Sequence, residues 1–62
     1  MTVIQFRKKV AIARKCGSAV MKRDGCVYVL YFHDTFWALW NETTHNCVAT
    51  AYHAEDLEYL FE

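Results

Sequence analysis

The 62-residue sequence contains no proline and only two glycines, Gly17 and Gly25. These absences remove the usual components of linkers, low-complexity segments and glycine-rich phosphate loops. The chain also has no apolar run approaching the roughly 20 residues that a membrane span requires. We therefore expect one domain over residues 1–62, without a linker, a repeat or a membrane segment.

Cysteine is scarce and widely spaced, with Cys16, Cys26 and Cys47 making an odd number. A basic triplet at positions 7–9 follows only a short apolar start, which is not the pattern of a secretory signal. We therefore expect free thiols in a cytoplasmic setting, with a disulfide from Cys26 to either other cysteine as the less favoured alternative. On their strands, Cys26 and Cys47 are expected to be small buried residues.

The residue types that could carry chemistry do not cluster. Structural zinc sites usually take ligands from close pairs such as CxxC, and only His45 and Cys47 are near neighbours here. A nucleophilic cysteine needs an adjacent base, and the helix end expected at Cys16 disfavours a thiolate. We expect no metal site, no cofactor and no enzymatic activity.

The stretch Cys26–Asn41 predicts the central hairpin of an antiparallel sheet. It is rich in β-branched and aromatic residues, which favour strands, and the apolar run is broken near Asp34. A two-residue loop at Asp34-Thr35 fixes which residues face each other across the hairpin. The predicted pairs are Phe32 with Trp37, Leu30 with Leu39, and Val29 with Trp40.

Both faces of this hairpin are apolar. One face carries Tyr28, Leu30, Phe32, Trp37 and Leu39. The other carries Val27, Val29, Tyr31, Phe36, Ala38 and Trp40. A half-solvated sheet alternates apolar and polar residues, so both faces of this one need cover. Two short helices can cover one face, and we expect the other to meet a second copy or a different protein, with Trp37 or Trp40 in a self-contact.

Helical signals precede the hairpin. Thr2 and Gln5 have the spacing of a capping box, apolar residues then recur at helical spacing, and Gly17 is a natural helix terminator. These features predict a helix over residues 3–16. The alternation of residues 2–6 also fits a strand, which remains the alternative.

The remaining segments complete an α+β fold. Ser18–Arg23 predicts a strand that turns at Asp24-Gly25, a strong type I′ signal. The pairs that this turn predicts are Arg23 with Cys26, Met21 with Tyr28, and Val20 with Val29. Residues 47–50 predict a short edge strand, and residues from 54 onward predict a helix with His53 as the weak choice of cap. The expected fold is an antiparallel meander of three or four strands flanked by an N-terminal and a C-terminal helix.

The net charge is zero, but all seven basic residues lie between Arg7 and Arg23 and all seven acidic residues between Asp24 and Glu62. A compact acidic surface can occupy a basic groove that normally takes nucleic acid. We therefore predict a non-enzymatic protein-binding module, in its sharpest form an inhibitor of a nucleic-acid-handling complex. The acidic residues proposed to contact the partner are Asp34, Glu42, Glu55, Asp56, Glu58 and Glu62.

In size and style the chain resembles small phage-encoded inhibitors of host defence, the anti-CRISPR proteins among them. The likeness is one of class, since no residue motif carries it. It implies an acidic surface that mimics nucleic acid and blocks a protein partner.

Two alternatives use the same charges differently. A small nucleic-acid-binding or regulatory domain would contact phosphates through Arg7, Lys8, Arg14 and Lys15. In the other alternative, the basic and acidic ends pack side by side and neutralise each other.

Overall fold

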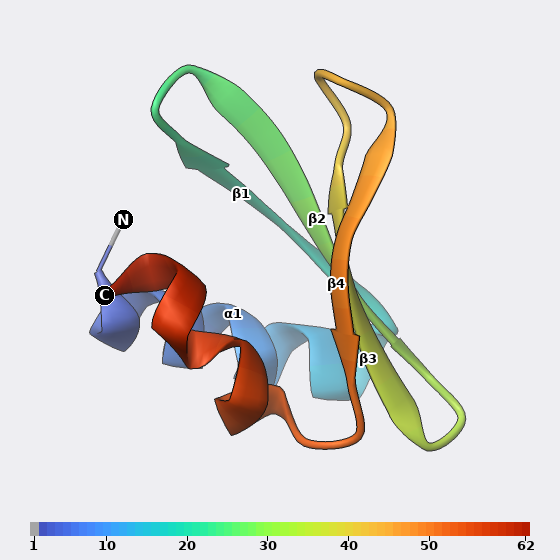
Figure 1. Cartoon of the computed structure of the whole chain (residues 1–62). Coiled ribbons are helices and arrows are strands. Elements are labelled where there is room, and N and C mark those ends of the chain that lie inside the picture. The colour runs from blue at the N-terminus through green and yellow to red at the C-terminus, as the bar shows by residue number, and fades with distance from the viewer. Residues whose placement is uncertain (1) are drawn as a thin grey trace.

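A four-stranded antiparallel meander carries both helices on one of its faces (Figure 1). The computed structural model describes residues 2–62. In chain order the elements are α1 (Val3–Cys16), β1 (Ser18–Arg23), β2 (Cys26–His33), β3 (Phe36–Asn41), β4 (Asn46–Ala51) and the 3₁₀ helix η1 (Ala54–Phe61). The strands lie in the order β1-β2-β3-β4. This is the predicted α+β meander with flanking helices.

Helix α1 has the predicted bounds and the predicted caps. The Thr2 hydroxyl accepts a hydrogen bond from the Gln5 backbone N–H at 3.3 Å, and the Gln5 side chain accepts one from the Thr2 N–H at 2.9 Å. Gly17, at φ 92°, ends the helix and donates its N–H to the Ala13 carbonyl at 2.7 Å. The alternative of a strand over residues 2–6 is wrong, because these caps satisfy the first and last turns of a helix.

The first two hairpins have the predicted register. All six predicted pairs are found, from Arg23 with Cys26 to Val29 with Trp40. Asp24 and Gly25 both have positive φ, as the type I′ turn requires, and Asp34 also has positive φ at the second turn. Turn chemistry and hydrophobic pattern therefore agree on one register for β1, β2 and β3.

Strand β4 departs from the prediction in length and regularity. It begins at Asn46 and ends at Ala51, and a bulge interrupts its pairing with β3. Cys47 lies opposite Trp40 while Ala49 lies opposite Leu39, so Val48 is the extra residue. The predicted burial of Cys47 is wrong: its side chain is exposed, because it lies on the uncovered side of an edge strand.

The C-terminal helix is present from residue 54, but it is a 3₁₀ helix. His53 occupies the predicted cap position in an extended conformation, without a side-chain cap hydrogen bond. The Asp56 N–H donates to the His53 carbonyl at 3.0 Å, which is the three-residue spacing of a 3₁₀ turn. Apolar residues three and four positions apart suit both helix types, so the sequence pattern did not distinguish them.

The core lies between the sheet and the two helices. We call this side of the sheet the covered face. Phe6 of α1 stacks on Phe61 of η1 with ring centroids 4.8 Å apart, and Phe32 stacks on Trp37 at 4.4 Å. The buried apolar residues are Phe6, Val10, Ala13, Ala19, Met21, Leu30, Trp37, Leu39, Ala54, Leu57 and Phe61. Of the two apolar faces predicted for the hairpin, the one containing Leu30 is therefore the core.

Adjacent substitutions on β2 test this division of the sheet. Leu30 is fully buried, so Leu30→Ala should lower the free energy of unfolding by roughly 2 to 5 kcal/mol. Tyr31 points to the opposite side, and Tyr31→Ala should cost about 1 kcal/mol or less in the isolated chain. Urea unfolding of both variants measures the difference. Equal losses would mean that the two faces are equally buried.

Candidate protein-binding surface

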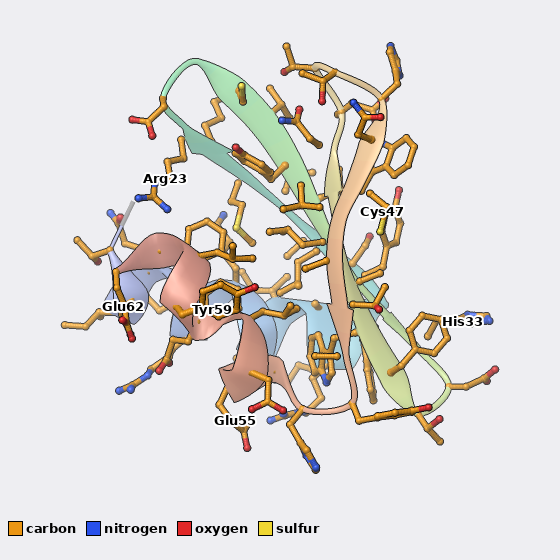
Figure 2. The ribbon with its side chains drawn as sticks, in the orientation of Figure 1. Arg23, His33, Cys47, Glu55, Tyr59 and Glu62 are labelled. Atoms are coloured by element: carbon orange, nitrogen blue, oxygen red, sulfur yellow. The ribbon has the colours of Figure 1, made fainter. Side chains whose placement is uncertain are left out.

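The side of the sheet away from the helices is uncovered, and we call it the open face. Its residues follow from the strand register. One row across the sheet contains Val20, Val29, Trp40 and Cys47. The next row contains Ser18, Tyr31, Ala38 and Thr50. Cys47 and His33 are labelled in Figure 2 on this side, away from η1.

Apolar and aromatic side chains of the open face are accessible. Val20 is 54% exposed and Tyr31 is 43% exposed, and the bulge residue Val48 of the edge strand β4 is also exposed. Trp40, Val29 and Ala38 are partly exposed between these positions. A contiguous apolar surface of this kind marks an interaction site more often than scattered exposed residues do.

Charged groups lie at the border of the open face. Lys22 is exposed and pairs with Val27 at one end of the sheet. At the same end, the Glu42 N–H donates to the Val27 carbonyl at 2.8 Å. The Glu42 carboxylate accepts a hydrogen bond from the Trp40 indole N–H at 2.9 Å, which holds the ring at the surface. The open face thus has an apolar centre and a polar border, as protein interfaces do.

The two tryptophans predicted for a self-contact are separated by the sheet. Trp37 is only 3% exposed and lies on the covered face, stacked on Phe32 and beneath the Arg14 guanidinium, which is 5.5 Å from the ring centroid. Trp40 lies on the open face. Trp37 and Trp40 are three positions apart on β3, and side chains an odd number of positions apart point to opposite sides of a strand. Of the two tryptophans, only Trp40 is therefore placed to contact another molecule.

The predicted acidic set is divided among three places. Asp34 is in the turn between β2 and β3, and Glu42 follows β3 at the opposite end of that strand. The other four residues are on or beside η1, where Glu55, Asp56 and Glu62 are exposed. Figure 2 shows Glu55 and Glu62 near opposite ends of η1. Four of the six predicted carboxylates therefore lie on or just after one element, η1.

Glu58 is held by an arginine of the basic helix. The Arg7 Nε donates to Glu58 Oε1 at 2.6 Å and Nη2 donates to Oε2 at 3.3 Å. Glu58 is 19% exposed, and the hydrogen bond from Arg7 is the main cause of the lowered pKa of its carboxyl. The same contact raises the pKa of Arg7. This ion pair joins the two oppositely charged ends of the chain.

Arg23 makes a second connection between these ends. Its guanidinium donates to the Leu60 carbonyl and lies over the Phe61 ring, 5.4 Å from the centroid. The two ends therefore pack side by side, as that alternative predicted, but the ion pair between them that neutralises charge is Arg7–Glu58 alone within residues 2–62. Residual charge stays on the outer surfaces of both helices.

The basic set predicted for nucleic acid is also divided. Arg7 binds Glu58 and Arg14 lies over Trp37, so both are directed toward the rest of the chain. Lys8 and Lys15 are exposed, and within residues 2–62 neither forms an ion pair. Two isolated lysines present a smaller phosphate-binding surface than the four residues that were predicted.

Among residues 2–62, hollows of the surface lie between the two helices and at the edge of the sheet. A cleft of about 310 Å³ lies between α1 and η1 and is lined by both charged and apolar side chains. Its lining residues are Phe6, Arg7, Val10, Arg14, Ala54, Glu55 and Glu58. A second hollow of about 240 Å³ lies at the edge of the sheet and is lined by Phe36, Thr50, Ala51 and Tyr52.

The three cysteines, Cys16, Cys26 and Cys47, are free. Cys16 lies before β1 and Cys26 lies after it, so the six residues of this strand hold the two cysteines roughly 20 Å apart. This distance rules out a disulfide between Cys16 and Cys26. In the described part of the chain, no group of three or more His, Cys, Asp or Glu side chains is placed to hold a metal ion. Among residues 2–62 there is also no helix long and apolar enough to cross a membrane.

Sequence reasoning missed part of the open face. Val20 and Cys47 were not included in a candidate site, although the predicted turn at Asp24-Gly25 already paired Val20 with Val29. That pairing was the signal that could have extended the surface onto β1. Cys47 and Val48 could not be placed, because the bulge that exposes them has no clear mark in the sequence.

Comparison with known proteins found no matching family model, no similar curated protein and no similar solved structure.

The Arg7–Glu58 pair predicts a specific acid dependence. The pKa of Glu58 is lowered from 4.5 on folding, so its contribution to stability is present above pH 4.5 and is lost as the pH falls through the lower folded-state value. Glu58→Gln should therefore lower the unfolding midpoint at neutral pH, and this difference from the natural chain should vanish in acid. Urea unfolding across a pH series measures it.

Glu55→Gln is the matched control for this experiment. Glu55 lies on the same helix and is exposed, and within residues 2–62 it forms no ion pair. Its substitution should leave the pH dependence of stability close to that of the natural chain. If both variants changed it equally, the acid dependence would not come from the Arg7 contact.

Proposed function

We propose that this chain is a non-enzymatic protein-binding module and that the open face of its sheet is the binding surface. The observation that carries the proposal is the accessible row of Val20, Val29 and Trp40, together with Tyr31 in the next row. Burying these apolar groups against another protein would gain about 25 cal/mol per Å² removed from water. The aromatic residues Tyr31 and Trp40 are the types that most often anchor protein interfaces.

A protein partner fits this surface better than nucleic acid does. Lys22 is the only lysine or arginine that the strand register places on the open face, whereas a surface that binds nucleic acid needs a basic path for phosphates. The chain's other exposed lysines include Lys8 and Lys15 of α1, on the opposite side of the sheet. Apart from Lys22, the exposed lysines are therefore on a different surface from Tyr31 and Trp40.

Site-specific crosslinking in the cells that make the chain tests this proposal. A photo-crosslinking phenylalanine analogue at position 31 should give a covalent adduct with protein, because Tyr31 is at the centre of the open face. The same analogue at position 59 is the matched control, since Tyr59 is an exposed tyrosine on η1. Protein adducts from position 59 alone, or adducts with nucleic acid alone, would overturn the proposal.

The exposed carboxylates of η1 support a second candidate, the inhibitor of a nucleic-acid-handling complex. Glu55, Asp56 and Glu62 remain on the surface, whereas Glu58 binds Arg7. Three carboxylates on one short helix can imitate a run of phosphates and would bind a basic groove quickly and in a salt-sensitive way.

Charge reversal separates this candidate from the first. In a pull-down from nuclease-treated bacterial lysate, the triple variant E55K/D56K/E62K should lose a partner held by the acidic surface, and high salt should release it. Glu58 is left unchanged so that the two helices stay connected. Retention of the same partner by the triple variant would contradict acidic mimicry, and Tyr31→Ala reports on the open face in the same assay.

A further inference from the structure

We infer that the open face is occupied by a second copy of this chain, in a two-fold symmetric pair of sheets packed face to face. This inference rests on the proposed function and names the partner. A two-fold axis that stacks the two open faces lies in the plane between the sheets, either parallel or perpendicular to the strands. Only one of these two axes makes the borders of the two open faces complementary in charge. That axis runs parallel to the strands.

The strand order determines what this axis brings together. Rotation about it places β1 over β4 and β2 over β3 of the second copy, and each row of one sheet lies over the same row of the other. Sheets pack about 10 Å apart, so side chains of facing rows interdigitate. All four strands of each copy are covered.

Large side chains then face smaller ones. Tyr31 lies over Ala38 of the second copy, and Trp40 lies over Val29 of the second copy, because these residues share rows across β2 and β3. At the edges, Val20 lies over Cys47 of the second copy, and Ser18 lies over Thr50. Alternation of large and small residues across facing positions is what a close-packed interface requires.

The charged border supports the same axis. Lys22 and Glu42 lie at the same end of the sheet, on either side of Val27. The rotation carries Glu42 of the second copy to the side of the sheet where Lys22 lies, within reach of its long side chain. Two-fold symmetry repeats the contact, so each pair of chains contains two Lys22–Glu42 ion pairs.

The perpendicular in-plane axis does not produce this match. It places β1 over β1 and reverses the ends of the sheet, so Lys22 faces the start of β1 near Ser18. Glu42 then faces the end of the sheet that carries Phe36. The His33 and Asp34 side chains at that end already contact each other, with Nε2 and Oδ2 3.4 Å apart. Lys22 and Glu42 would therefore lose water without gaining an unpaired opposite charge, which is unfavourable at an interface.

Analytical ultracentrifugation of the full chain, from micromolar to submillimolar concentration, measures the pairing directly. The natural chain should reach twice its monomer mass of 7.3 kDa. Lys22→Glu and Glu42→Lys should each weaken the pairing by about tenfold or more, because each puts like charges together at two positions. The double variant K22E/E42K should restore it, because the opposite charges meet again with their positions exchanged.

Two variants match these charge changes away from the open face. Lys8→Glu on α1 and Glu55→Lys on η1 alter exposed residues by the same charge and should leave the pairing unchanged. Circular dichroism of every variant shows whether the fold is retained.

Three results would overturn the inference: a chain that stays monomeric throughout, pairing insensitive to both single substitutions, or a double variant that fails to recover. The crosslink at position 31 distinguishes these failures from failure of the proposed function. An adduct of twice the chain mass supports the pair, and an adduct with a different protein keeps the proposed function while overturning the self-pairing.

Discussion

The sheet has two apolar faces, but the chain contains only enough helix to cover one of them. The rest of the structure follows from this constraint. Both α1 and η1 pack on the face that carries Leu30 and Leu39, and Phe6 stacks on Phe61 to join them. A 62-residue chain buries only about 60% of the surface that its unfolded form exposes, so its core is necessarily small. Concentrating both helices on one side completes that core and leaves Tyr31 and Trp40 accessible on the other.

The same arrangement explains where the unevenly distributed basic and acidic residues of the sequence lie in the structure. Because η1 returns to lie beside α1, the acidic end of the chain meets the basic end, and Arg7 binds Glu58 across them. Arg23 reaches the last turn of η1 in the same way. Charges that appear in the sequence as two opposed surfaces therefore become partly an internal connection, and fewer remain for an outside partner.

Much of the fold could be predicted because the signals are local. The capping box at Thr2, the glycine at position 17 and the turn at Asp24-Gly25 act through neighbouring backbone groups, and each gave the observed element or register. The bulge at Val48 and the 3₁₀ geometry of η1 were not predictable. Both depend on how an edge strand and a short helix pack against the rest of the core. The local sequence of each segment is compatible with more than one structure.

The residues alone predicted the α+β meander, the register of its first two hairpins, and the two residue sets that line opposite sides of the central hairpin, because alternation along a strand has a period of two residues. Tertiary packing selected which of these two sets became the core. That choice depends on where the helices dock, and it placed Trp37 inside and Trp40 outside. Tertiary packing also pairs Glu58 with Arg7 and, within residues 2–62, leaves Glu55 without an ion pair, since residues 51 positions apart meet only when the chain has folded.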